Sequence, residues 1–156
     1  MLLHPNVVAV QQRLEAAGSR NRIVLLDEGV HTAAAAAEAL GVQVGQIANS
    51  LVFDVDGEPL LVLTSGAHRV DTAKVAAALD AKELKRAKPE FVREHTGQVI
   101  GGVAPVGHPR PLKTVLDKDL AQYEVIWAAG GIPQAVFPIT YPELLAMTGA
   151  AELDVA

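Results

Sequence analysis

The sequence contains no cysteine, few aromatic residues and fewer basic than acidic residues. Without cysteine, the chain has no disulfide, no thiol nucleophile and no thiolate metal ligand, and nothing in it indicates an oxidising compartment. Aromatic residues make up 4% of the chain, too few to form a row of exposed rings on which several bases could stack. The formal net charge of −5 argues against sequence-independent binding to a long phosphate backbone, so we expect no DNA partner.

The common cofactor and nucleophile motifs are also missing. The sequence has no G-x-G-x-x-G, no G-x-x-x-x-G-K-[ST], no H-E-x-x-H and no G-x-S-x-G. No two of its five histidines are three or four residues apart, and none clusters along the chain with acidic residues at metal-ligand spacing. We therefore predict neither a metal site nor a bound cofactor. The N-terminal segment lacks a basic leader and a long apolar run, so we expect a cytoplasmic protein with no membrane partner.

The composition that remains is that of a globular protein. Half of the 156 residues are hydrophobic and 20% are charged, far from the composition of disordered chains. This length suffices for one domain with a real core, and no linker rich in glycine, serine or proline divides the chain. We therefore expect a single domain over residues 1–156.

Local signals predict an irregular succession of helices and strands. Asp56-Gly57 between two apolar runs, residues 50–55 and 59–64, predicts a tight hairpin. Helix caps are predicted at Asn6, Thr32, Asp71 and Thr140, the last with Glu143 as a capping box, and stops at Gly18, Gly41 and Gly97. Further strands are expected in residues 23–26 and in LKTVL, EVIWAAG and AVFPI, and the chain is expected to end on the helix YPELLAMTG. Because hairpin signals outnumber βαβ units, we predict an α+β fold: a curved, mixed, largely antiparallel sheet surrounded by helices.

Basic residues gather in one segment. Lys82, Lys85, Arg86 and Lys88 fall within seven positions of a chain that is acidic overall. Short charge clusters of this kind are usually solvated surface. A local contact with a short nucleic-acid end is the alternative, and the sequence leaves both open.

A glycine-rich stretch, IGGVAPVGHP at residues 100–109, is almost free of reactive side chains. Glycine lets the backbone come close to a ligand and adopt positive φ, while Pro105 and Pro109 stiffen the loop. Backbone N–H groups in such a loop can hold a carbonyl oxygen or the oxyanion that develops from it. An ordinary tight connection between a helix and a strand would have the same composition.

Several segments, in order, resemble the YbaK and prolyl-tRNA-synthetase-associated domain family of editing domains. They are IANSLVFDVDGEPLLVLTSGAHRVD, AKELKRAKPEFVREHTG, QVIGGVAPVGHPRPLKTVLDKDL, and VIWAAGG with AVFPITYPELL. The most specific patterns are TG-x-x-x-GGV-x-P-x-G, carried by Thr96, Gly97, Gly101, Gly102, Val103, Pro105 and Gly107, and SG-x-x-R-x-D, carried by Ser65, Gly66, Arg69 and Asp71. The resemblance runs from about Thr32 to the last helix.

This resemblance implies a YbaK-like fold and an aminoacyl-tRNA deacylase, a hydrolase that acts without metal on the ester of a mischarged tRNA. Its implied partners are the aminoacylated acceptor end of tRNA and an aminoacyl-tRNA synthetase. The residues expected to carry catalysis are Gly101, Gly102 and Val103, through their backbone N–H groups, with Asn49 and Ser50 orienting the ester. The expected substrate-binding residues are Gly66, His68, Arg69, Thr96, Ala104, Pro105, Gly107, His108, Gly130, Gly131 and Ile132. Small apolar walls at Val103, Ala104, Ile132 and Val136 favour a small amino acid.

The resemblance has one clear departure. Many family members have a lysine where this chain has Asn49, and asparagine forms hydrogen bonds but lacks the charge that attracts phosphate. A non-catalytic module that binds aminoacyl-tRNA or a synthetase is therefore one alternative. A hydrolase of small acyl esters or amides unrelated to tRNA is another.

Single residues also keep two interpretations. Arg69 either contacts phosphate or pairs with Asp71. His108 either orders the water or contacts the ribose, or it is an exposed turn residue without such a role. Trp127 and Phe137 are interpreted as core residues.

Overall fold

The computed structural model describes residues 4–19, 21–27, 29–30 and 32–156, so His31 lies outside the described residues. Eight strands of the described chain form one sheet in the order β1-β7-β6-β2-β3-β5-β8, with β4 beside β2. The strands are β1 Val24–Leu25, β2 Ile47–Val55, β3 Glu58–Ser65, β4 Lys85–Arg86, β5 Lys113–Asp117, β6 Ile126–Ala129, β7 Ala135–Ile139 and β8 Ala151–Leu153. Four pairings are antiparallel and three are parallel, so the predicted mixed α+β sheet is confirmed.

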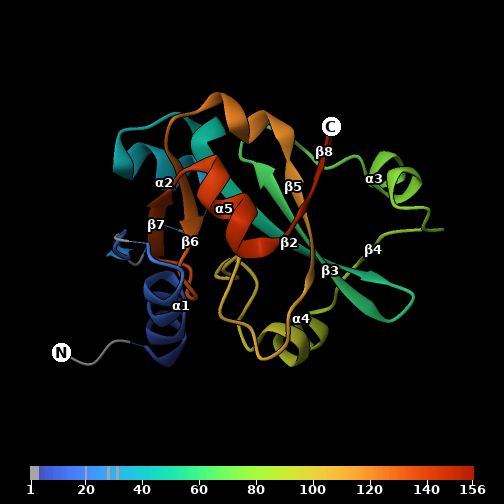
Figure 1. Ribbon diagram of the computed structural model, residues 1–156, viewed down its shortest axis with the longest axis horizontal. Helices are drawn as coiled ribbons and strands as arrows, with labels where there is room; N and C mark the ends of the chain where they lie inside the picture. Colours follow the sequence, from blue (N-terminus) through green and yellow to red (C-terminus); the bar gives the residue numbers. More distant parts are fainter. Residues whose placement is uncertain (1–3, 20, 28, 31) are drawn as a thin grey trace.

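Helices surround this sheet. They are α1 Pro5–Ala16, α2 Ala33–Leu40, α3 Thr72–Ala78, α4 Pro89–Thr96 and α5 Tyr141–Thr148, with short 3-10 turns η1 Val44–Gln46 and η2 Lys118–Gln122. Figure 1 shows α1 at the lower left, α4 at the bottom and α3 at the right of the sheet. No helix among the described residues has the length and apolar character needed to cross a bilayer.

Capping residues start and stop most helices where the sequence predicts. Thr32 Oγ1 accepts the Ala35 N–H at 3.0 Å, and Asp71 Oδ1 accepts the Lys74 N–H at 3.1 Å. Thr140 and Glu143 form the reciprocal capping box that opens α5. Gly41 and Gly97 end α2 and α4 in the left-handed conformation.

Two sequence predictions about the chain ends are wrong. Helix α1 begins at Pro5 and is capped by His4, whose Nδ1 accepts the Asn6 N–H at 3.0 Å. Proline favours the first helical position, so the cap lies before it rather than at Asn6. The last element is the strand β8, not α5, because residues 151–153 pair in parallel with β5.

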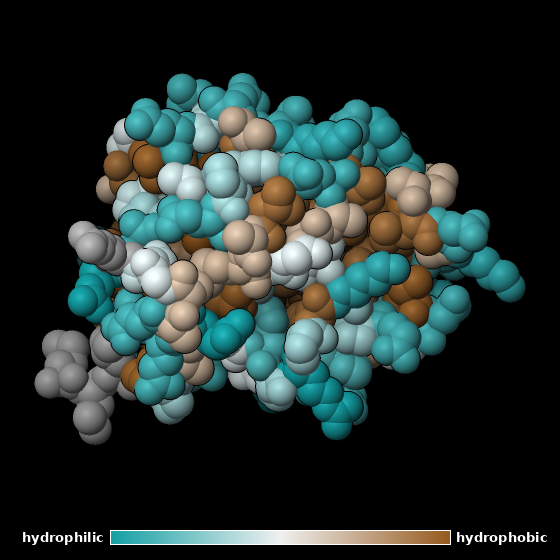
Figure 2. Space-filling model, viewed as in Figure 1, coloured by the Kyte–Doolittle hydropathy of each residue, from teal (hydrophilic) through white to brown (hydrophobic). Residues whose placement is uncertain are grey.

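The β2–β3 hairpin forms the centre of the core. Asp56 and Gly57 make its turn with φ of 52° and 86°, as predicted. Strand β3 is buried on both faces: Leu61 and Leu63 belong to the largest apolar cluster, while Leu60 and Val62 belong to a second cluster on the opposite face. Figure 2 shows that the viewed surface is mainly hydrophilic, with apolar residues emerging at its centre and right.

Candidate active site in a gap beside strand β2

The edge of β2 opposite β3 is only partly covered. At one end β6 pairs with it through Ile47 and Ala48, and at the other end β4 pairs with it through Phe53 and Asp54. In the part of the chain that the structure describes, no strand pairs with this edge at residues 49–52. The glycine-rich loop after α4 reaches this gap, as Gly101 and Val103 line the same cavity as Asn49 and Ser50. The sheet therefore leaves an opening that the loop borders.

The cavity in this gap is small and electrically neutral. Its volume is about 70 Å³. Its walls are formed by Val30, Thr32, Ala33, Ala36, Ile47, Ala48, Asn49, Ser50, Gly101, Val103, Trp127, Ala128, Ala129, Pro133 and Val136. None of these described wall residues has a titratable side chain, so the chemistry available here is that of amide, hydroxyl and backbone groups.

Buried hydrogen bonds fix the loop that borders the cavity. Gln98 is 2% exposed, and its Oε1 accepts the Ala104 N–H at 2.8 Å. Thr96 Oγ1 accepts the Gln98 N–H at 3.0 Å and donates to the Val92 carbonyl at 2.7 Å. On the far side, His108 Nε2 lies 2.7 Å from the Ala104 carbonyl, and burial lowers the pKa of His108. The loop is thus held from behind, by groups outside the cavity.

Two N–H groups of this loop have no hydrogen-bond partner among the described residues. The Gly102 N–H donates to the Val99 carbonyl at 2.9 Å and is already used. The described residues offer no hydrogen-bond acceptor to the N–H groups of Gly101 and Val103, both of which line the cavity. Gly101 has a φ of 90°, which only glycine adopts without strain. Unpaired N–H groups of residues that line a small cavity are suited to stabilising a developing oxyanion.

Gly102 contributes through close packing. A Cβ atom at this position would lie 2.7 Å from the backbone of Ile132, so only glycine lets the two loops touch. Gly131 is equally crowded, because a Cβ there would lie 2.8 Å from the Asn6 carbonyl oxygen. A Cβ at Gly66 would lie 2.5 Å from the Val44 carbonyl oxygen.

Several predicted binding residues lie away from the cavity walls. Thr96 and Ala104 are buried and take part in the hydrogen bonds behind the loop, while Gly130 is buried and its N–H donates to the Ala135 carbonyl at 2.7 Å. Pro105, Gly107 and His108 line a second cavity of about 410 Å³, together with Arg13 and Arg110. Of the predicted walls, Val103 and Val136 line the small cavity. Phe137 is a core residue as predicted, but Trp127 is only half-buried and lines the small cavity.

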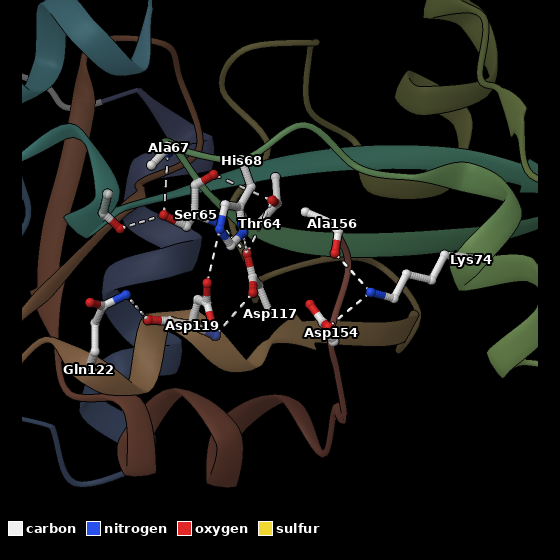
Figure 3. Close-up of polar contacts among 11 residues, drawn as sticks. Thr64, Ser65, Ala67, His68, Lys74, Asp117, Asp119, Gln122, Asp154 and Ala156 are labelled. Carbon is white, nitrogen blue, oxygen red and sulfur yellow. Dashed lines mark hydrogen bonds and ion pairs between the residues drawn. The ribbon is translucent and has the colours of Figure 1, made fainter.

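His68 belongs to a separate polar cluster (Figure 3). Its Nδ1 lies 2.8 Å from Asp117 Oδ2 and its Nε2 lies 2.9 Å from Asp119 Oδ2. Asp117 is fully buried and also accepts the Ser65 N–H at 2.9 Å. These three side chains, brought together by the fold, are the described group that could hold a metal ion, although both nitrogens of the ring already face carboxylates. Arg69 is exposed, and Asp71 caps α3 instead of pairing with it.

Comparison with known proteins identifies the family. Residues 27–147 match the family model described as the aminoacyl-tRNA editing domain. The chain belongs to the aminoacyl-tRNA editing domain family. A crystal structure of a protein described as a candidate trans-editing enzyme for prolyl tRNA synthetase is 46% identical, with a TM-score of 0.93, and the match covers 99% of this chain and 98% of that one.

Curated relatives of this editing domain include both free-standing and much longer proteins. Protein YwhH of Bacillus subtilis is 30% identical over 125 residues, which is 80% of this chain and 79% of that protein. Proline–tRNA ligase of Maridesulfovibrio salexigens is 32% identical over 106 residues, 65% of this chain. The matched region spans only 17% of that ligase's length.

One residue that contacts two glycine-containing loops of this editing domain was not predicted from the sequence. Asn6 Nδ2 lies 3.3 Å from the Gly97 carbonyl oxygen and 3.4 Å from that of Gly131, so it donates toward both glycine-containing loops. Its position near the chain start suggested a helix cap, and only the tertiary fold places it between two distant segments. Ser50 Oγ is buried and has no hydrogen-bond partner among the described residues.

Proposed function

We propose that the protein is an aminoacyl-tRNA deacylase, which hydrolyses the ester of a tRNA mischarged with a small amino acid. The observation that carries this proposal is a neutral cavity of about 70 Å³ in a member of the editing-domain family; Gly101 and Val103 line it, and their N–H groups have no acceptor among the described residues. A cavity of this size suits a small side chain. The relatives include proline–tRNA ligases, so tRNA charged wrongly by such a ligase is the first substrate to test.

In the proposed reaction, the ester carbonyl oxygen accepts hydrogen bonds from the N–H groups of Gly101 and Val103. Water attacks the carbonyl carbon, and these donors stabilise the negative oxygen of the tetrahedral intermediate. The carbon–oxygen bond to the ribose then breaks, the ribose oxygen takes up one proton of the attacking water, and the amino acid leaves as its carboxylate while the second proton passes to solvent. Because the described cavity walls contain no titratable side chain, the substrate's own neighbouring ribose hydroxyl positions the water.

Such an enzyme meets a physical need. One missing methylene changes binding by only about 1–3 kcal/mol, so a synthetase pocket cannot reject every smaller amino acid. A second, smaller site can admit what the first wrongly accepted and exclude the larger correct residue. Val103 and Val136 line the cavity here and are suited to that size limit.

The test is a panel of tRNAs charged with alanine, serine, threonine, cysteine and proline. We expect one small aminoacyl ester to be hydrolysed well above its spontaneous rate and the prolyl ester to survive. Comparison with the same amino acid esterified to adenosine alone separates tRNA editing from general ester hydrolysis, since only editing predicts a large advantage for tRNA. Equal loss of all esters, or of none, would contradict the proposal.

A second candidate function is binding of aminoacyl-tRNA or of a synthetase without hydrolysis. Asn49 favours it: this exposed residue lines the cavity at the position where the family resemblance implies a lysine in many members, and it brings no charge to attract phosphate. Under this alternative, the wild-type chain binds charged tRNA without shortening its lifetime, and Asn49→Lys gains hydrolysis. Under the deacylase proposal, the wild-type chain already turns over.

A further inference from the structure

A strip of exposed cations lies beside the candidate site. We name Lys82, Lys85, Arg86 and Lys88 the basic strip; all four residues are exposed. None of them forms an ion pair with the residues that the structure describes. Two acidic residues, Glu83 and Glu90, lie in the same segment, so the strip keeps an excess of positive charge in a chain whose net charge is −5.

The sheet fixes the strip next to the cavity. Lys85 and Arg86 form β4, which pairs with Asp54 and Phe53 on the same edge of β2 that carries the gap. From Ser50 in the cavity wall to Phe53 is three residues, or about 10 Å of strand. Figure 1 shows β4 to the right of the glycine-rich loop and β6 to its left.

The direction of the chain brings the strip back toward the site. Because β4 is antiparallel to β2, the residues after Arg86 run toward the cavity end of β2. Lys88 then occupies the position before α4, and α4 leads directly into the glycine-rich loop. One short stretch of chain therefore joins the cations to the proposed oxyanion donors.

We infer that the basic strip binds the phosphates of the tRNA acceptor end while its aminoacyl ester occupies the cavity. This inference rests on the proposed function and extends it, because the cavity itself has no charged group to hold a nucleic acid. A short row of cations suits the few phosphates next to the ester. The acidic remainder of the protein surface repels the rest of the tRNA. Affinity for tRNA then comes from this edge and not from the cavity.

The test compares two variants of equal charge. Lys85→Gln/Arg86→Gln removes two strip cations, and Lys113→Gln/Lys118→Gln removes two exposed cations near β5, which lies beyond β3 on the other side of β2. We expect the strip variant to raise KM for charged tRNA ~10-fold near physiological salt and to reduce the salt dependence of log KM by about one unit for each cation removed. The kcat of the strip variant, and its rate on the aminoacyl ester of adenosine alone, should match those of wild type. The control variant should match wild type in KM, kcat and salt dependence.

Binding of uncharged tRNA, followed by fluorescence anisotropy, keeps this test separate from that of deacylation. If wild type binds tRNA and hydrolyses nothing, the proposed function fails, while a weaker strip variant still supports the strip. Equal affinity of wild type and strip variant, or equal loss in both double variants, would overturn the inference. Thermal unfolding of each variant verifies that it is folded.

Discussion

The two sides of the glycine-rich loop differ in how their polar groups are used. On the side of β2, Gly101 and Val103 line a cavity of about 70 Å³, and their N–H groups have no acceptor among the described residues. On the other side, Ala104 is bonded through both its N–H and its carbonyl, to Gln98 and His108. The hydrogen bonds of Ala104 therefore fix the conformation of the loop that carries the unpaired N–H groups. Donors that are fixed before the substrate arrives need no reorganisation during the reaction.

The two cavities on either side of the loop differ in volume as well as in the hydrogen bonding of the loop. The cavity behind the loop, at about 410 Å³, is much larger and is lined by Arg13 and Arg110, yet it borders the side of the loop whose polar groups are already bonded. The smaller cavity borders the side with free donors. The candidate site is therefore identified by its unpaired N–H donors and not by the volume of the cavity.

The largest effect should follow from crowding the contact that shapes the loop. In Gly102→Ala, the new Cβ meets the Ile132 backbone, which cannot move aside as a flexible side chain would. We expect a loss of about 1–3 kcal/mol in the free energy of unfolding. Displacement of the donors should lower kcat/KM for the preferred charged tRNA by about 100-fold.

Gly29→Ala is the matched control for that variant. Gly29 has open space around its Cβ position and no positive φ, so its substitution should change neither unfolding nor turnover. Equal behaviour of the two alanine variants would show that the Gly102 contact does not shape the site.

A smaller effect is expected from loosening the bonded side of the loop. Gln98→Leu removes the acceptor of a buried N–H and should cost about 1–3 kcal/mol in urea unfolding. Gln122→Leu, at an exposed glutamine, is the control and should stay near wild type. If Gln98→Leu is as stable as the control, the loop is not held from behind.

The smallest effect concerns the pH dependence of stability. Burial lowers the pKa of His108 from its ordinary value of 6.5, so the unfolded chain binds the proton more tightly than the folded chain. Stability should therefore be intact above about pH 6.5 and decline as the pH falls through the lowered folded-state pKa. His108→Gln should flatten this decline without changing the free energy of unfolding near pH 8, measured by urea titration at each pH. An unchanged pH profile would argue against the buried, neutral ring.

Local signals in the sequence predicted much of the fold. Caps such as Thr32 and Asp71, and the Asp56-Gly57 turn, depend on neighbours within a few residues, and the structure has them where the sequence indicates. The pairing of strands that lie far apart in the sequence could not be predicted from local signals. The parallel pairing of Ile47 with Trp127 joins segments that are distant in the sequence. The two-residue strand β4 lies in a charged stretch whose composition is typical of solvated surface. Both pairings are needed to create the gap beside β2.

The candidate site was predictable in part. The glycine-rich stretch, Asn49 and Ser50 follow from the family patterns, and the structure brings Gly101, Val103, Asn49 and Ser50 around one cavity. Which N–H groups of the loop are free depends on bonds that no motif encodes, such as that from Gly102 to Val99. Asn6 and Trp127 contribute through tertiary position alone.

The most direct test of the account replaces the Val103 backbone amide by an ester, using the α-hydroxy acid with the valine side chain. This change removes one N–H donor and leaves the shape of the loop nearly intact. The account predicts that kcat for the preferred charged tRNA falls by about 100- to 1,000-fold, while the same replacement at exposed Val125 has no effect. A folded Val103 ester variant that retains wild-type kcat would contradict catalysis by backbone donors.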